Sequence, residues 1–329
     1  MEKKQDNLME ISDLTVRYNT DDAVVHAVNN FNLKLVRGDA HGLVGETGAG
    51  KTTLALSILR LLPERVGEVT GGSIVYDGQE LLNLPEAEML PLRGKRISMI
   101  FQDPMTSLNP TQTVGDQILE VLNLHFPEMT RDEKNKRVDE MMTLVGIPPQ
   151  RKKSFPHEFS GGMKQRVVIA MALVAEPELL LADEPTTALD VTIQAQILEL
   201  MKQLREKFNT SVMLITHDLG VVAQFCDSVS VVYAGRVVEY GPVEIVFQRK
   251  ENHPYTAGLF NCIPNLHDDQ PRLHPIAGHM ADPRVEYKGC CFADRCEYAT
   301  ERCRTEAPSM HVCGEHGILC HRYAEKEEF

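Results

Sequence analysis

A glycine-rich segment of the sequence has the residue types and spacing that bind phosphate. Residues 45–52 read Gly-Glu-Thr-Gly-Ala-Gly-Lys-Thr and fit the pattern G-x-x-x-x-G-K-[ST]. Glycines let backbone N–H groups wrap around phosphate oxygens, and a following helix N-terminus favours the anion. Lys51 is placed to reach the β- and γ-phosphates of a nucleotide, and the Thr52 hydroxyl to bind Mg²⁺. The segment predicts nucleotide binding, and the alternative is an ordinary glycine-rich turn.

Two carboxylates follow an apolar stretch farther along the chain. Residues 179–182 are Leu-Leu-Leu-Ala, and Asp183 and Glu184 come directly after them. In a phosphate-loop protein, an Asp at such a strand end holds Mg²⁺ directly or through water. Glu184 is then placed to polarise an attacking water. Taken alone, the pair also fits a strand exit with solvated acids. Together with the phosphate loop it favours catalysis.

The apolar patterning predicts the elements that must position these groups. Alternating or continuous apolar residues predict strands near 14–18, 31–35, 41–44, 74–76, 97–101, 179–182, 211–216 and 229–233. Helical spacing predicts helices near 53–59, 118–122, 138–145 and 193–204. Strands that alternate with helices predict an α/β fold with a parallel sheet, here with a helical insertion.

Composition limits the classes of function. The chain has 329 residues with 43% hydrophobic and 25% charged residues, which excludes wholesale disorder and fibrous repeats. Its net charge of −13 disfavours a nucleic-acid binder, because that class normally carries a basic face. The eight cysteines are unevenly placed. Cys226 and Cys262 are scattered, and the other six lie between residues 290 and 320.

The sequence also bears on the cellular compartment. The first seven residues are polar and mixed in charge, and no apolar region of a secretory signal follows them. The longest apolar run, Val167 to Ala175, is nine residues, whereas a membrane span needs about 20. We therefore expect a cytosolic chain, in which thiols stay reduced. Clustered cysteines in that compartment favour metal or cluster ligation over disulfides.

A second glycine-rich segment points to a known family. Residues 159–166, Phe-Ser-Gly-Gly-Met-Lys-Gln-Arg, resemble the signature motif of ATP-binding cassette (ABC) ATPases, with Met163 where Gln is usual. Ser160 is of N-cap type, and two glycines permit close backbone approach at the start of an apolar helix. Such a helix start is an anion site. In the family it contacts the γ-phosphate of a nucleotide held by a second subunit.

The other family motifs occur in the expected order. Residues 101–104 resemble the Q-loop, in which Gln102 senses Mg²⁺ or water. Residues 188–190 resemble the D-loop, which crosses the dimer interface. Thr216-His217-Asp218 resembles the segment of the switch histidine, and Tyr18 the aromatic residue that stacks on adenine. An isolated histidine or tyrosine is otherwise more often structural.

The resemblance implies a set of roles. Glu184, His217 and Gln102 are the implied catalytic residues, and Thr52, Gln102 and Asp183 the implied Mg²⁺ ligands. The implied nucleotide contacts are Tyr18, Gly45, Glu46, Thr47, Gly48, Ala49, Gly50, Lys51, Thr52, Thr53, Ser160, Gly161, Gly162 and Asp190. The implied fold is a P-loop ABC cassette over 1–250, with a mixed or parallel core sheet, an antiparallel β subdomain and a helical subdomain at about 103–165. A Cys-rich C-terminal extension over 251–329 follows.

Three stretches resemble one branch of the family, the peptide importers. They are residues 101–110, residues 253–259 beginning His-Pro-Tyr-Thr, and the Cys-rich tail. In that branch the tail resembles a motif that binds a 4Fe–4S cluster, and the match selects Cys290, Cys296, Cys303 and Cys320. Cys291 and Cys313 are extra to the pattern. Spacing alone leaves a Cys₄ zinc site, or no metal, as alternatives. Hydrolysis needs no redox chemistry, so the expected cluster is a structural staple.

The branch implies ATP hydrolysis that energises import of di- or oligopeptides. Its expected partners are a second, different ABC subunit in a head-to-tail dimer, two membrane permeases and an extracytoplasmic solute-binding protein. The chain is then peripheral, at the cytoplasmic face of the membrane. The same ATPase role for nickel, glutathione or another small solute is an alternative. Two alternatives of other classes are a soluble ABC ATPase acting on nucleic acid or the ribosome, and a non-catalytic ATP switch.

Overall fold

The computed structural model describes residues 6–187, 189–248, 250–262 and 275–324. The chain forms two compact units. Of the described residues, the first comprises Asp6, Val36–Ala40 and those in Asn83–Ile215, and the second comprises Asn7–Leu35, His41–Leu82 and those from Thr216 onward. Across the described ranges, no helix combines the length and apolar character that crossing a membrane requires.

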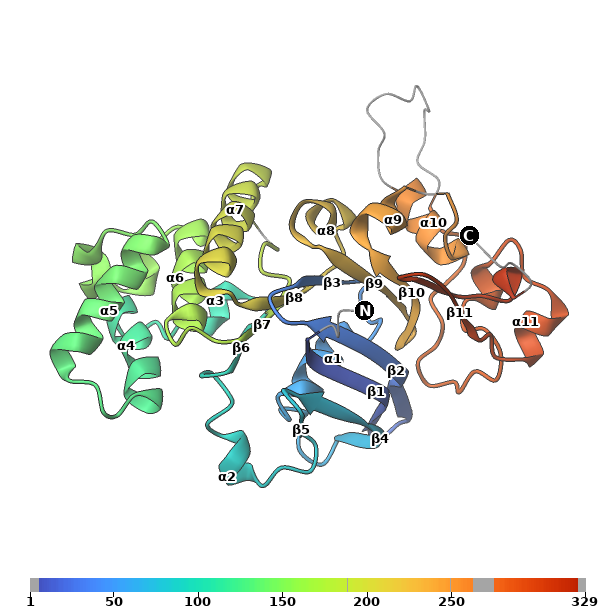
Figure 1. Ribbon diagram of the computed structural model, residues 1–329, viewed down its shortest axis with the longest axis horizontal. Helices are drawn as coiled ribbons and strands as arrows, with labels where there is room; N and C mark the ends of the chain where they lie inside the picture. Colours follow the sequence, from blue (N-terminus) through green and yellow to red (C-terminus); the bar gives the residue numbers. More distant parts are fainter. Residues whose placement is uncertain (1–5, 188, 249, 263–274, 325–329) are drawn as a thin grey trace. The chain divides into compact units, whose positions relative to one another are not determined.

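The first unit has a parallel sheet and most of the helices. Strands β6 (Ile97–Ile100), β7 (Leu179–Asp183) and β8 (Ser211–Thr216) pair side by side in parallel, and β7 and β8 are buried along their length. Continuous apolar runs such as Leu179–Ala182 suit strands that are covered on both faces. The helices are α2 (Glu86–Met89), α3 (Pro104–Ser107), α4 (Val114–His125), α5 (Arg131–Leu144), α6 (Gly161–Leu173) and α7 (Val191–Phe208). In Figure 1, α4, α5 and α6 form one helical group.

An antiparallel sheet forms one part of the second unit. Its strand order is β2-β1-β4-β5, with β1 at Asn7–Asn19, β2 at Val24–Val36, β4 at Gly67–Tyr76 and β5 at Gln79–Glu80 (Figure 1). Asp77 and Gly78 connect β4 to β5, and both have positive φ, as a two-residue hairpin turn requires. Along β1 buried and more exposed residues alternate, as in a sheet with one covered face.

A second sheet in this unit continues to the C-terminal extension. Strand β3 (Ala40–Val44) is parallel to β9 (Ser228–Tyr233), and β9 is antiparallel to β10 (Arg236–Pro242). β10 then pairs with β12 (His316–Leu319), which pairs with β11 (Met310–Cys313). The helices are α1 (Lys51–Ile58), α8 (Leu219–Phe225), α9 (Val243–Phe247), α10 (Pro254–Asn261) and α11 (Glu301–Thr305).

The predicted fold class is confirmed, with one local correction. Phe101, expected to continue the strand of Ile97 and Met99, lies beyond the end of β6 and is 47% exposed. The strand ends at Ile100 because the chain turns there into the segment of Gln102. The division at residue 250 stays a prediction. The pairing of β12 with β10 continues the sheet of the second unit into the extension.

Candidate functional site

The phosphate loop lies between the end of β3 and the start of α1. Lys51 Nζ donates to the carbonyl oxygens of Gly45 (2.7 Å) and Glu46 (3.0 Å), so the ammonium lies inside the loop. Gly50 has φ +97°, and a Cβ there would lie 2.2 Å from the Ala27 carbonyl oxygen. Only glycine fits this position. The loop therefore presents backbone N–H groups, a helix N-terminus and one cation to an anion.

Tyr18 and Thr53 contact each other beside this loop. Tyr18 is half-buried on β1, and its hydroxyl donates to Thr53 Oγ1 at 3.2 Å. Thr53 lies in the first turn of α1, directly after Thr52 of the motif. Tyr18, which the family resemblance groups with the phosphate loop, therefore lies beside that loop. Its expected role in adenine stacking stays a prediction.

The acidic pair ends β7 in the first unit, where Gln102 contacts it. Asp183 is 2% exposed and Glu184 9% exposed. Glu184 has φ +47°, a left-handed conformation that is strained for a residue other than glycine and that clusters at functional sites. Its Oε2 accepts hydrogen bonds from Gln102 Nε2 (3.0 Å) and Thr187 Oγ1 (2.9 Å). The carboxylate is thus held in one orientation.

The signature segment begins helix α6. Ser160 is the N-cap, and its Oγ accepts a hydrogen bond from the Met163 N–H at 3.4 Å. A Cβ on Gly162 would lie 2.6 Å from Ile193 Cγ2 of α7, so this glycine allows the two helices to pack closely. Gly161 is exposed at the helix start. The segment thus has an open helix N-terminus.

Asp190 and His217 lie at the ends of other elements. Asp190 is the N-cap of α7 and accepts from the Ile193 N–H at 3.0 Å. His217 is exposed between β8 and α8, and Asp218 next to it caps α8. Ala188, the first residue of the predicted D-loop, lies outside the described residues.

The predicted residues fall into two groups, each described within its own unit. The first unit brings Gln102 and Glu184 into contact and holds Asp183, the signature segment and Asp190. The second unit brings together the phosphate loop, Tyr18 and Thr53 and also holds His217. The assigned roles of all these residues stay predictions.

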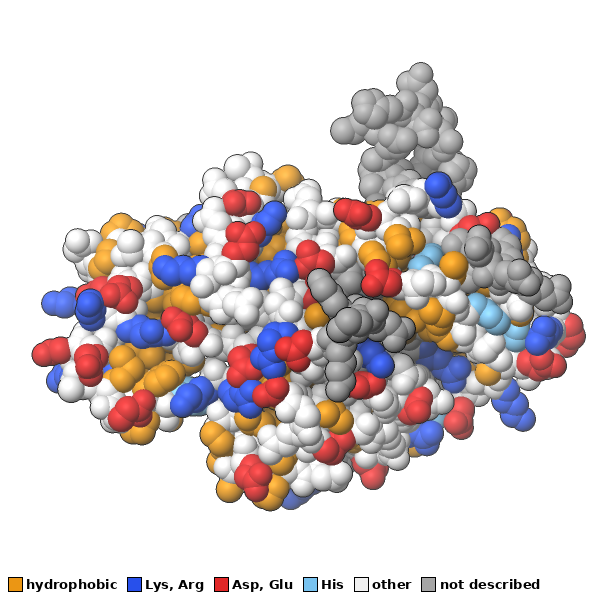
Figure 2. All heavy atoms as spheres, in the orientation of Figure 1, with side chains coloured by type: hydrophobic (Ala, Val, Ile, Leu, Met, Phe, Trp, Pro, Cys, Tyr) orange, Lys and Arg blue, Asp and Glu red, His pale blue; other side chains and the backbone are white. Residues whose placement is uncertain are grey.

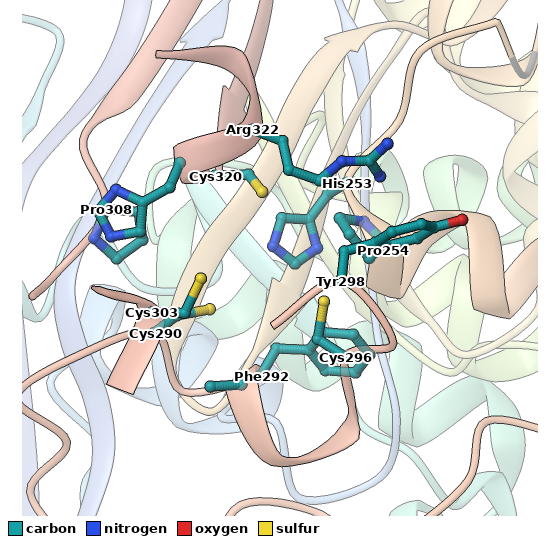
Figure 3. Close-up of a pocket in the computed structure, with 12 residues that line it drawn as sticks. His253, Pro254, Cys290, Phe292, Cys296, Tyr298, Cys303, Pro308, Cys320 and Arg322 are labelled. Atoms are coloured by element: carbon teal, nitrogen blue, oxygen red, sulfur yellow. The ribbon is translucent and has the colours of Figure 1, made fainter. Parts of the chain in front are cut away.

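Four cysteines of the tail line one cavity. Cys290, Cys296, Cys303 and Cys320 line this cavity together with His253, Phe292 and other side chains. Figure 3 shows their sulfur atoms turned toward this space. These are the four that the family resemblance selects. Cys291 instead is buried with its sulfur 3.9 Å from the Tyr233 carbonyl oxygen, and Cys313 lies on β11.

Burial favours the neutral form of three thiols of the cavity, those of Cys290, Cys296 and Cys320. Burial, with the nearby Cys291, Cys320 and Cys303 thiols, raises the pKa of Cys290 to about 12. Burial also raises the pKa of Cys296 and of Cys320 above the ordinary value, and neighbouring cysteines contribute in the same direction. Thiolates at these positions therefore need a nearby positive charge, which a bound metal supplies.

The sequence reasoning assigned no role to two residues that contact the phosphate loop. The Arg295 guanidinium lies 2.7 Å from the Glu46 carboxylate, and the Tyr255 hydroxyl accepts from the Glu46 N–H at 2.9 Å. Both residues lie in stretches that resemble the peptide-importer branch. That resemblance was the only sign in the sequence that these two residues have a role. Local patterns could not reveal their contacts with Glu46, because both residues lie far from it along the chain.

Comparison with family models gives two matches. Residues 28–187 match the model described as ABC transporter. Residues 238–303 match the model described as oligopeptide/dipeptide transporter, C-terminal region. The second match includes Cys290, Cys296 and Cys303 and ends before Cys320.

Curated proteins are similar over nearly the whole chain. The chain is 47% identical to the oligopeptide transport ATP-binding protein OppD of Haemophilus influenzae, covering 98% of each chain. It is 48% identical to the protein of the same name from Escherichia coli, covering 93% of this chain and 90% of that protein.

Solved structures are similar over the cassette. One is a dimeric ATP-binding cassette in a post-hydrolysis state with ADP and Pi, at TM-score 0.64 and 28% identity, covering 71% of this chain and 98% of that chain. Another is cbiO1 from Clostridium perfringens, described as part of an ABC transporter complex. It has a TM-score of 0.65 and 30% identity, and the match covers 75% of this chain and 92% of that chain.

Proposed function

The chain belongs to the oligopeptide-transport branch of the ABC transporter ATPases, and from that membership we propose how its residues hydrolyse ATP to drive peptide import. The observation that carries the proposal is the phosphate loop. Lys51 lies against the carbonyls of Gly45 and Glu46, at the N-terminus of α1. The loop binds the β- and γ-phosphates of ATP through Lys51 and its backbone N–H groups.

The acidic pair supplies the chemistry at the γ-phosphate. Glu184 orients or deprotonates the attacking water, and Gln102 and Thr187 hold its carboxylate in position. Mg²⁺ neutralises phosphate charge when bound, and Asp183 with the Thr52 hydroxyl is the oxygen donor set that suits it. His217 contacts the γ-phosphate, and Tyr18 stacks on the adenine. In-line attack then depends mainly on positioning and electrostatics.

The signature segment serves the nucleotide of a partner cassette. The open N-terminus of α6 at Ser160, Gly161 and Gly162 suits a γ-phosphate, and Asp190 lies at the same dimer interface. The similar cassette solved with ADP and Pi is dimeric, which supports this assembly. We propose that the second subunit is a different ABC chain and that the dimer binds two permeases, with an extracytoplasmic solute-binding protein in the full system. The chain is then peripheral at the cytoplasmic face of the membrane.

The charge distribution fits this assignment better than nucleic-acid binding. The net charge is −13. On the face shown in Figure 2, described Lys and Arg side chains are interspersed with Asp and Glu. That face presents no continuous basic surface among the described residues, and nucleic-acid binders rely on such a surface.

Purification from solubilised membranes, together with an uptake assay, tests the proposal. The tagged chain is expected to bring along a second ABC subunit and two integral membrane proteins. Cells carrying Lys51→Ala are expected to lose uptake of a labelled tripeptide, and parental cells to retain it. Uptake of nickel or glutathione that depends on the chain, with no peptide uptake, would overturn the peptide assignment.

The Cys-rich cavity fits a 4Fe–4S cluster, which we propose as a structural cofactor. Four cysteines around one cavity are the usual ligand set of such a cluster. Among the described residues, no group of three or more His, Cys, Asp or Glu side chains is arranged to hold a metal ion. A Cys₄ zinc site remains the alternative occupant of the cavity. The cluster, when bound, cross-links a segment that has few apolar side chains.

Iron and acid-labile sulfide analysis of the anaerobically purified chain tests the cofactor. We expect iron and sulfide in the parental chain and their loss in Cys296→Ser. Cys313→Ser is the matched control and is expected to retain both. Zinc in place of iron, or equal iron in both variants, would contradict the assignment.

A further inference from the structure

The C-terminal extension holds the phosphate loop through a two-pronged ion pair. Arg295 Nη1 lies 2.7 Å from Glu46 Oε2, and Arg295 Nη2 lies 3.1 Å from Glu46 Oε1. The Arg295 side chain is 5% exposed, and its Nε donates to the Ala277 carbonyl oxygen at 3.2 Å. A fork that matches a carboxylate in this way fixes orientation as well as charge.

A second contact fixes the backbone of the same residue. The Glu46 N–H donates to the hydroxyl of Tyr255, a fully buried side chain at the start of α10. The Tyr255 ring packs against Tyr233 and Phe292, with centroids 4.7 and 5.5 Å apart. Both the carboxylate and the amide of Glu46 are therefore held by residues that follow the cassette in sequence.

The charge of Glu46 explains why its ion pair with Arg295 matters for binding a nucleotide. Glu46 places a carboxylate within a loop that binds a triphosphate, and like charges at close range repel. A guanidinium is protonated at any physiological pH, so the two-pronged contact with Glu46 is an ion pair. Arg295 thus compensates the one negative side chain of the motif.

Two cysteines flank the segment that carries Arg295. Residues Ala293–Arg295 form a single helical turn between Cys290 and Cys296, which both line the cavity. The turn is therefore anchored at its two ends by groups that face the same space. Phe292, at its start, lies in the aromatic group with Tyr255.

We propose that Arg295 is a positioning residue for ATP binding, which neutralises and orients Glu46 so that the phosphate loop accepts a triphosphate. The C-terminal extension thereby sets the affinity of the cassette for ATP. This inference rests on the proposal that the phosphate loop binds ATP.

Equilibrium titration of the full-length, anaerobically purified chain with a fluorescent ATP analogue and Mg²⁺ tests the inference. We expect Arg295→Gln to weaken binding on the order of tenfold, the factor that about 1.4 kcal/mol produces. In the Glu46→Gln background no carboxylate needs compensation, so adding Arg295→Gln is expected to change affinity by less than about twofold relative to Glu46→Gln alone. A merely structural role of Arg295 predicts the same weakening in both backgrounds.

Two further variants complete the design. Arg295→Lys keeps the charge but loses the two-pronged contact, so it is expected to weaken binding less than Arg295→Gln does, and it provides a test if Arg295→Gln does not fold. Arg302→Gln removes an exposed arginine that pairs with Glu306 in the same extension, and parental affinity is expected. Unchanged affinity in Arg295→Gln, equal weakening by Arg295→Gln in the parental and Glu46→Gln backgrounds, weaker binding in Arg295→Lys than in Arg295→Gln, or equal weakening in Arg302→Gln would each overturn the inference. If the parental chain does not bind the analogue, the proposed function itself falls.

Discussion

The side-chain amide of Gln102 donates a hydrogen bond to the carboxylate of Glu184 at 3.0 Å, across 82 residues of sequence. Gln102 follows the end of β6 and Glu184 the end of β7, and these strands are parallel neighbours. The carboxyl ends of adjacent parallel strands meet at one edge of a sheet, so the fold itself brings the two residues together. The carboxylate of the proposed general base is therefore held by a side chain from the end of the neighbouring strand.

Replacing Glu184 by Gln is expected to stop hydrolysis and to leave ATP binding intact. The amide keeps the shape of the side chain but removes the base, and general bases contribute about 10²- to 10⁴-fold in rate. Phosphate release and analogue binding, measured on the same preparation of the assembled transporter, check this. Hydrolysis at the parental rate would remove Glu184 from the catalytic role.

Gln102→Ala is expected to lower the hydrolysis rate by about tenfold, less than the loss of the base itself. The variant removes one hydrogen bond that orients the Glu184 carboxylate, and Thr187 Oγ1 still holds it at 2.9 Å. Thr187→Val is the matched comparison, since it removes the bond from Thr187 to the same oxygen. An effect of Gln102→Ala as large as that of Glu184→Gln would indicate a direct role of Gln102 in the chemistry.

Met163→Gln is expected to leave hydrolysis within about threefold of parental, because Gln has a similar length and Met163 is only half-buried. Arg151 Nη1 lies 3.7 Å from the Met163 sulfur, and a Gln side-chain oxygen accepts from the same donor. The Arg151 guanidinium also lies 4.2 Å from the centre of the Phe159 ring, a contact that the swap retains. Gly162→Val is the positive control, since its side chain collides with Ile193. A tenfold loss in Met163→Gln would show that the departure from the family motif matters.

The sequence predicted those parts of the molecule that are encoded locally. Each strand with alternating or continuous apolar residues was found, and the phosphate loop lies at the predicted turn from strand to helix. Local patterns suffice there because one element determines its own burial. The four-cysteine set was predicted by family resemblance, and the structure places all four around one cavity.

Contacts between distant segments were not predictable in this way. Arg295 and Glu46 are separated by 249 residues, and nothing in either local pattern marks them as a pair. The strand β10 was also missed, because Arg236, Glu239 and Gly241 interrupt its apolar character. Glu239 is fully buried, and its hydrogen-bond partners Asn252 and His316 lie later in the chain.

Removing the imidazole of His316 is expected to lower the free energy of unfolding by about 1.5–3 kcal/mol, the range for a hydrogen bond to a charged group. Glu239 Oε1 accepts from Asn252 Nδ2 at 2.7 Å and contacts His316 Nε2 at 2.8 Å, and both His316 and Glu239 are buried. His316→Ala leaves this carboxylate with fewer partners. Urea denaturation followed by circular dichroism measures the change. Val312→Thr, an exposed position on the neighbouring strand, is the control and is expected to shift by less than about 0.5 kcal/mol.

His41 is expected to make the chain less stable as the pH falls from 7 to 5. Its ring nitrogens lie 2.8 Å from Ser228 Oγ and 2.9 Å from Ser230 Oγ, and burial lowers its pKa to about 4 from an ordinary value of 6.5. The unfolded chain therefore binds a proton below pH 6.5 that the folded chain does not. Stability is fully present above pH 6.5 and falls by about 2 kcal/mol by pH 5.

Urea denaturation at several pH values, on chains of equal metal content, measures this dependence. In His41→Gln the amide can still bond to the serine hydroxyls but does not titrate, so the slope between pH 7 and pH 5 is expected to be smaller. Some slope remains, because burial also lowers the pKa of His253, to about 3. Equal slopes in the parental chain and in His41→Gln would contradict a buried, neutral His41.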